Sequence, residues 1–112
     1  MRIIAACLVV LTLAGCASSP PPATDQERNE VMMALDFCLR AAARKLDDGR
    51  SEASTIALGL RPSCAGEFAR SRDVFGRNLN PTAREIYDQK DQAAFIQVAT
   101  SVVLEERTSR QQ

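Results

Sequence analysis

The feature that most constrains the fold of this chain is the uncharged, largely apolar run at residues 3–15. It follows Arg2 directly and ends at Cys16, before a polar, proline-rich stretch. A membrane-spanning helix needs about 20 apolar residues, so the run is too short to cross a bilayer. A helix buried in a protein core would carry polar residues at a helical period, and Thr12 is the one polar residue here. A charged start before a short apolar run is typical of a signal that is removed.

The last residues of this run and the cysteine after it, Leu13-Ala14-Gly15-Cys16, resemble a lipobox, the processing signal of bacterial lipoproteins. The resemblance implies that the Cys16 thiol receives a diacylglycerol, with acyl chains such as palmitate, and that residues 1–15 are removed. A plain secretory signal is the alternative. Ala17 stands where an Asp commonly retains Gram-negative lipoproteins in the inner membrane. The resemblance therefore implies an outer-membrane lipoprotein that faces the periplasm.

The chain then divides into three parts. Residues 1–15 are the signal peptide, residues 16–23 are the lipidated cysteine and a tether with three prolines, and residues 24–112 form one helical periplasmic domain. Consecutive prolines favour polyproline II, which extends by about 3.1 Å per residue. The tether is expected to hold the domain roughly 20 Å from the lipid anchor.

The expected processing limits which of the four cysteines can form a disulfide. Cys7 lies in the removed peptide, and Cys16 is expected to carry the lipid, which leaves Cys38 and Cys64 in an oxidising compartment. A disulfide between them is predicted, and closing this loop stabilises a domain by roughly 3.5 kcal/mol. Two buried free thiols are the alternative. No metal site is expected, because structural zinc usually has four Cys or His ligands and the chain has no histidine.

The first helix is predicted to begin at a capping box formed by Thr24 and Glu27. It is expected to end in the sequence Asp47-Asp48-Gly49, where glycine suits the left-handed closing position. Its apolar positions recur at helical spacing along one face, and two further residues widen that stripe: Val31, Leu35, Cys38, Ala42 and Leu46, with Met32 and Leu39.

The next segment is predicted to be one helix from about Glu52 to Phe75, capped by Ser51 and kinked at Pro62. Two helices broken at Arg61-Pro62 are the alternative. Asn80 followed by Pro81 then indicates the start of a C-terminal helix. Residues 88–92 are polar and suggest a break in it, and a frayed polar tail is expected after Glu105-Glu106-Arg107.

No alternation typical of a β-strand appears in the sequence. We therefore predict an all-α fold, a small bundle of three to four helices. Its first part is an antiparallel helical hairpin stapled by the Cys38–Cys64 disulfide, and a C-terminal helix completes it.

The residue types indicate no catalytic machinery. The absence of histidine excludes Ser-His and Cys-His nucleophile systems, and no glycine-rich phosphate loop is present. The acidic pairs Asp47-Asp48 and Glu105-Glu106 are expected to be solvated helix ends. No catalytic residue, cofactor, small-molecule substrate or nucleic-acid partner is predicted, and the protein is expected not to be an enzyme.

Basic and acidic side chains balance at fourteen each, but the middle of the chain has a local excess of arginine. The arginines outnumber the neighbouring carboxylates of Glu67 and Asp73 by three. We interpret them as a solvated helix surface, with an anionic lipid or acidic partner as the alternative. The arginines are Arg61, Arg70, Arg72, Arg77 and Arg84.

Three functions are compatible with these features. The first is an envelope lipoprotein that acts by contact with another envelope protein, as a structural or accessory subunit. The second is a chaperone similar to secretin pilotins, with which the chain shares size, anchor and helical class but no motif. A pilotin-like protein requires an apolar groove beside Phe68, Phe75 or Phe95 that is open to a partner helix. The third, a periplasmic inhibitor, requires a protruding loop.

Overall fold

Four helices account for most of the part of the chain that the computed structural model describes, residues 19–112. No strand occurs within those residues. The all-α prediction is confirmed, with four helices. The predictions for residues 1–15 and for Cys16 lie outside the described residues. The helices are α1 (Asp25–Leu46), α2 (Ala53–Ser63), α3 (Ala65–Gly76) and α4 (Pro81–Arg110).

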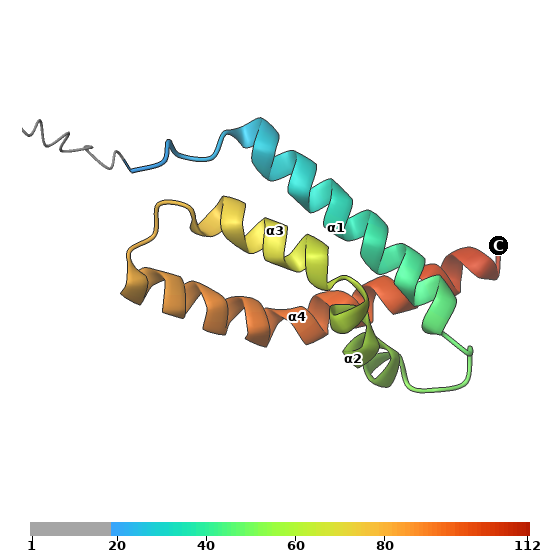
Figure 1. Ribbon diagram of the computed structural model, residues 1–112. Coiled ribbons are helices and arrows are strands. Elements are labelled where there is room, and N and C mark those ends of the chain that lie inside the picture. The colour runs from blue at the N-terminus through green and yellow to red at the C-terminus, as the bar shows by residue number, and fades with distance from the viewer. Residues whose placement is uncertain (1–18) are drawn as a thin grey trace, which may run out of the picture.

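The two long helices, α1 and α4, run in the same general direction and cross near their C-terminal ends (Figure 1). They diverge toward their N-terminal ends, and α3 runs between them in the opposite direction. The short α2 packs against the C-terminal half of α4. Within residues 19–112, no helix combines the length and the apolar character that crossing a bilayer requires.

Both ends of α1 form as predicted. The backbone N–H of Glu27 donates to the Thr24 hydroxyl at 3.1 Å, and the Glu27 carboxylate accepts from the Thr24 N–H at 2.8 Å. This reciprocal capping box satisfies two backbone donors that the first helical turn leaves free. At the other end, Gly49 has a φ of +71°, a conformation that side chains with a Cβ rarely adopt.

The predicted single kinked helix over residues 52–75 is wrong. The chain forms α2 and α3, and the break falls at Cys64 rather than at Arg61-Pro62. Pro62 has no N–H to give to the carbonyl of Leu58, yet α2 continues past it to Ser63. The Cys64 N–H then bonds to the carbonyls of Leu60 and Arg61, which closes the last turn, while its own backbone leaves the helical region at φ −116°.

The predicted cap at Ser51 is also wrong. The N-cap of α2 is Glu52, which makes no side-chain capping bond. The Ser51 hydroxyl donates instead to the Asp48 carboxylate at 2.8 Å, and Asp48 also accepts from the backbone N–H groups of Arg50 and Ser51. Asp48 thus organises the connection between α1 and α2, and this competes with capping by Ser51.

The helix α4 begins as predicted, with the Ala83 N–H donating to the Asn80 side chain at 2.8 Å. It then continues without interruption to Arg110, so both the break at residues 88–92 and the frayed tail are wrong predictions. The polar stretch stays helical because its carboxylates face other helices. Asp88 accepts from Arg72 of α3, and Asp91 accepts from Arg61 of α2.

Cys38 of α1 is joined to Cys64, the residue between α2 and α3, with 6.0 Å between the two Cα atoms. The predicted hairpin with its disulfide is therefore present. Around it lies one apolar core to which all four helices contribute. Its fully enclosed members include Ala43, Ala57, Leu60, Cys64, Ala99 and Val103.

Two carboxylates that were expected to be solvated are buried where α1 and α4 cross. The Asp47 side chain is fully buried and accepts two bonds from Arg107, at 3.0 and 2.7 Å, with a further contact from Arg110. The Glu106 side chain, 8 % exposed, accepts from Arg44 at 2.9 Å and from Arg40 at 3.4 Å. We call these two carboxylates and their arginines the carboxylate clamp.

The hydrogen bonds from Arg107 are the main reason that the pKa of Asp47 lies far below its ordinary value. Hydrogen bonds from the Gly49 N–H and from Arg110 also lower this pKa. A carboxyl whose pKa is depressed by folding stabilises the folded state above its unfolded pKa, about 3.9. That contribution is lost as the pH falls below this value.

We therefore expect Asp47→Asn to lower the free energy of unfolding at pH 7 by about 2–3 kcal/mol, because it leaves two arginines without their buried anion. The variant should also lose less stability than the wild type between pH 5 and pH 2. Urea unfolding followed by circular dichroism measures both effects. Asp25→Asn, at an exposed carboxylate of α1, is the matched control and should stay close to the wild type; equal losses in both variants would contradict the clamp.

Candidate docking groove

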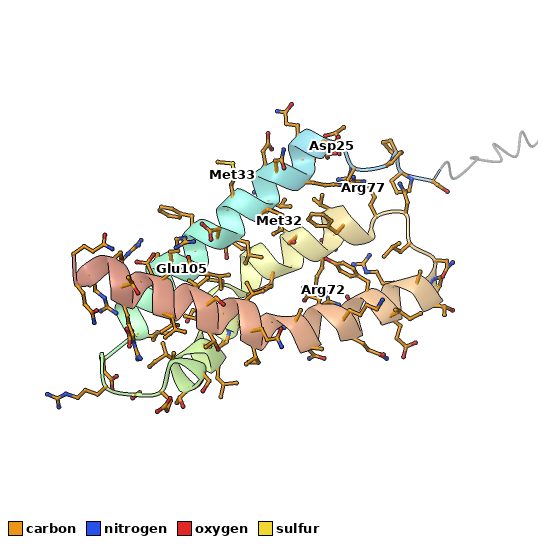
Figure 2. All side chains as sticks on the ribbon, turned by 180° about the vertical axis from the view of Figure 1, so that it is seen from behind. Asp25, Met32, Met33, Arg72, Arg77 and Glu105 are labelled. Carbon is orange, nitrogen blue, oxygen red and sulfur yellow. A yellow bond between two sulfur atoms is a disulfide. The ribbon has the colours of Figure 1, made fainter. Side chains whose placement is uncertain are left out.

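An apolar groove of about 370 Å³ opens between α1, α3 and α4, on the face seen in Figure 2. A concave surface with mostly apolar walls and a few polar groups is the usual form of a binding site in proteins. The residues that line it are Met32, Leu35 and Leu39 of α1, Phe68, Ser71 and Phe75 of α3, and Tyr87, Asp91, Ala94, Phe95 and Val98 of α4.

The groove exists because α1 and α4 diverge from their crossing while α3, between them, forms the floor. The rings of Phe68 and Phe95 meet edge to face, 5.2 Å between centroids, and join α3 to α4 along that floor. Figure 2 shows Met32 on the side of α1 that faces the groove and the adjacent Met33 pointing away from the bundle. Their exposed fractions, 50 % and 73 %, agree with this placement.

An arginine that does not itself line the groove supports its floor. The Arg61 guanidinium lies 5.0 Å from the ring centre of Phe68 and 5.1 Å from that of Phe95. It also donates to Asp91 at 3.1 Å. Stacking of a cation on two rings adds to the stability of the contact among α2, α3 and α4. Arg61 therefore holds together three residues of the groove lining: Phe68, Phe95 and Asp91.

Three polar side chains interrupt the apolar lining: Ser71, Tyr87 and Asp91. Tyr87 and Asp91 are one helical turn apart on α4. Burial raises the pKa of Tyr87, and the negative charges of Asp91 and Asp88 act in the same direction. The hydroxyl is thus neutral at physiological pH and is able to donate a hydrogen bond.

The arginine excess of the middle segment is largely neutralised by carboxylates from elsewhere in the chain. Arg77 pairs with Glu27 of α1 at 3.0 Å, and Arg72 pairs with Asp88 of α4. Each arginine lowers the pKa of its partner carboxyl. The interpretation as a plain solvated surface is therefore wrong for these residues, since they tie helices together.

The two disulfide cysteines predicted from the sequence do not line the groove. Cys64 belongs to the buried core and Cys38 packs against it, while Cys16 lies outside the described residues. The sulfurs of Cys38 and Cys64 and a Glu67 carboxylate oxygen come within 4.8 Å of one another. Sulfurs joined in a disulfide are not the thiolates that bind metals, so this group is not a metal site in the oxidised protein.

Sequence reasoning did not find the groove itself, because its aromatic and methionine residues have the same helical spacing as core residues. Only the requirement for an open channel beside Phe68, Phe75 or Phe95 pointed to this place, and all three line the groove.

Comparison with known proteins adds no assignment: no family model matches the chain, and neither the curated proteins nor the solved structures contain a match.

An open groove and a closed core respond differently to a larger side chain. We expect Ala94→Trp to change the free energy of unfolding by less than about 0.5 kcal/mol, because Ala94 is exposed and the indole can enter the groove. Ala99→Trp, at a fully buried position five residues further along α4, should cost about 2–3 kcal/mol through overpacking. Urea unfolding compares the two. A similar large loss in both variants would show that the groove is closed in solution.

Proposed function

We propose that this protein is a lipoprotein anchored through Cys16 in the bacterial outer membrane, where its helical domain acts in the periplasm by contact with another envelope protein. The groove between α1, α3 and α4 carries the proposal. An apolar hollow of this size on a small domain exposes hydrocarbon surface to water unless something covers it.

The position of the tether supports the same proposal. Ala23, where the tether ends, is buried against Val31 of α1 and Val74 of α3. Phe75 packs against this cluster and also lines the groove. The tether therefore joins the domain at the wide end of the groove, and anchoring at Cys16 would hold that end toward the membrane.

Binding rather than catalysis is the activity that these residues favour. The groove contains a hydroxyl at Ser71, but the chain has no histidine to activate it as a nucleophile. Asp91, the one carboxylate in the lining, is already paired with Arg61. We propose no enzymatic activity, cofactor or nucleic-acid partner.

A pilotin-like chaperone is the second candidate, and the openness of the groove beside Phe68, Phe75 and Phe95 favours it. In this case the partner is an outer-membrane secretion component, one of whose helices lies in the groove. An inhibitor role has less support, because the connection between α1 and α2 is held down by hydrogen bonds to Asp48.

A photo-crosslinking amino acid in place of Met32 tests the proposal in the native envelope. Met33 is the matched control, since it is the next residue of the same helix and points away from the groove. We expect irradiation to attach a defined protein partner at Met32 and not at Met33. Ala94→Trp should abolish the crosslink, because the indole occupies the groove.

The anchor is tested in the same cells. Cys16→Ser should lose palmitate labelling and reduce the Met32 crosslink, because the domain is no longer held at the membrane. Equal crosslinks at Met32 and Met33, or a Met32 crosslink that survives Ala94→Trp, would contradict binding in the groove. Palmitate incorporation into Cys16→Ser would contradict the anchor.

A further inference from the structure

We infer that the groove selects an amphipathic helix of the partner that carries a lysine or arginine, and that Asp91 binds this cation. The inference rests on the proposed function and adds the chemistry of the segment that is recognised.

Asp91 is the one charged side chain in the lining of the groove. Its partner, Arg61, does not line the groove. It lines a separate hollow with Pro62, Phe68 and Arg72. On the groove side, a ligand meets the carboxylate and not the guanidinium.

The carboxylate retains capacity for a second donor. Asp91 accepts one bond within the described residues, at Oδ2 from Arg61, while an ionised carboxylate has about four acceptor positions. Its side chain is 28 % exposed, so a ligand in the groove can reach the remaining positions. A ligand that covers Asp91 without a donor would leave these acceptor positions without a hydrogen-bond partner, which is unfavourable for a charged group.

Ser71 and Tyr87, the two other polar residues of the lining, form a polar strip with Asp91. Because Phe68 contacts Phe95 and Arg72 pairs with Asp88, α3 and α4 run antiparallel with Ser71 opposite Asp91. Ser71 is 6 % exposed, and neither its hydroxyl nor that of Tyr87 bonds to a described residue. The polar strip crosses the groove on the side away from the α1–α4 crossing, and the Leu39 end is apolar.

A helix matches this distribution better than an acyl chain does. The lining extends over about 10 Å of α1, from Met32 to Leu39, and about 16 Å of α4, from Tyr87 to Val98. This is two to three helical turns, so apolar residues at i, i+4 and i+7 can enter the apolar end. An acyl chain would cover Asp91 with hydrocarbon. A helix can place one basic residue over it.

The test uses a displayed library of helical peptides of about 14 residues, a length that exceeds the groove. Four positions at helical spacing are restricted to Leu, Ile, Met, Val and Phe, and the others are randomised. Selection is performed on the mature lipidated protein in detergent. We expect the enriched peptides to share a Lys or Arg at one fixed position relative to the apolar residues, and Ala94→Trp to abolish their binding.

The affinities of one enriched peptide for the wild type and for two protein variants then show whether its cation binds Asp91. Asp91→Asn should weaken binding about tenfold, the effect of losing one charge-assisted hydrogen bond. Asp88→Asn is the matched control, because Asp88 is paired with Arg72 and does not line the groove; it should change the affinity less than about twofold. Replacing the peptide's basic residue by norleucine should weaken binding to the wild type but not to Asp91→Asn. The comparison of the two peptides on the wild type alone needs no protein variant.

The outcomes separate the two proposals. If no peptide is enriched on the wild type, binding in the groove fails and the inference fails with it. If apolar peptides are enriched and Ala94→Trp blocks them, but no basic residue is selected, the groove remains a docking site and the role of Asp91 is overturned. Equal affinities of the lysine and norleucine peptides for the wild type would overturn it as well.

Discussion

The carboxylate clamp at the crossing of α1 and α4 is the interaction on which the shape of this domain depends. Asp47 at the end of α1 and Glu106 near the end of α4 are both buried, and each is bound by two arginines of the other helix. A buried carboxylate without partners would be protonated or would open the structure. The clamp therefore fixes the two helices at their C-terminal ends and leaves their N-terminal ends to diverge.

The groove follows from this crossing of α1 and α4 and from the position of α3 between them. The short α3 crosses this space as a floor, and the disulfide at Cys64 fixes where α3 begins. Phe68 and Phe95 close the floor, with Arg61 stacked behind them. Nothing in the described residues covers the opening above Met32 and Val98, whose side chains are half exposed. An unfilled hollow exposes apolar surface to water, which is unfavourable for a small domain. A partner that fills the hollow would remove this surface from water.

Much of the fold could be predicted from the sequence because it depends on local rules. Thr24 with Glu27, the Gly49 turn and Asn80 before Pro81 each determine a helix end through residues close in the chain. The pairing of Cys38 with Cys64 could be predicted because the expected lipoprotein processing accounts for Cys7 and Cys16 and leaves these two.

What could not be predicted depends on residues far apart in the sequence. Glu106 has the local pattern of a solvated helix end, and only Arg40 and Arg44, more than sixty residues earlier, make it a buried ion pair. Likewise, Asp88 and Asp91 resemble a helix break until Arg72 and Arg61 are placed beside them. The groove was missed for a similar reason: helical spacing places Met32 on an inner face but does not say whether that face is covered.

Binding of a partner in the groove between α1, α3 and α4 can be measured at two adjacent methionines, Met32 and Met33. Their methyl groups, labelled with ¹³C, report separately on the groove wall at Met32 and on the outer surface at Met33. When a helical peptide from the library or from the crosslinked partner is added, we expect the Met32 signal to move and the Met33 signal to stay in place. Movement of Met33 alone, or bound peptide with neither signal moving, would contradict binding in the groove.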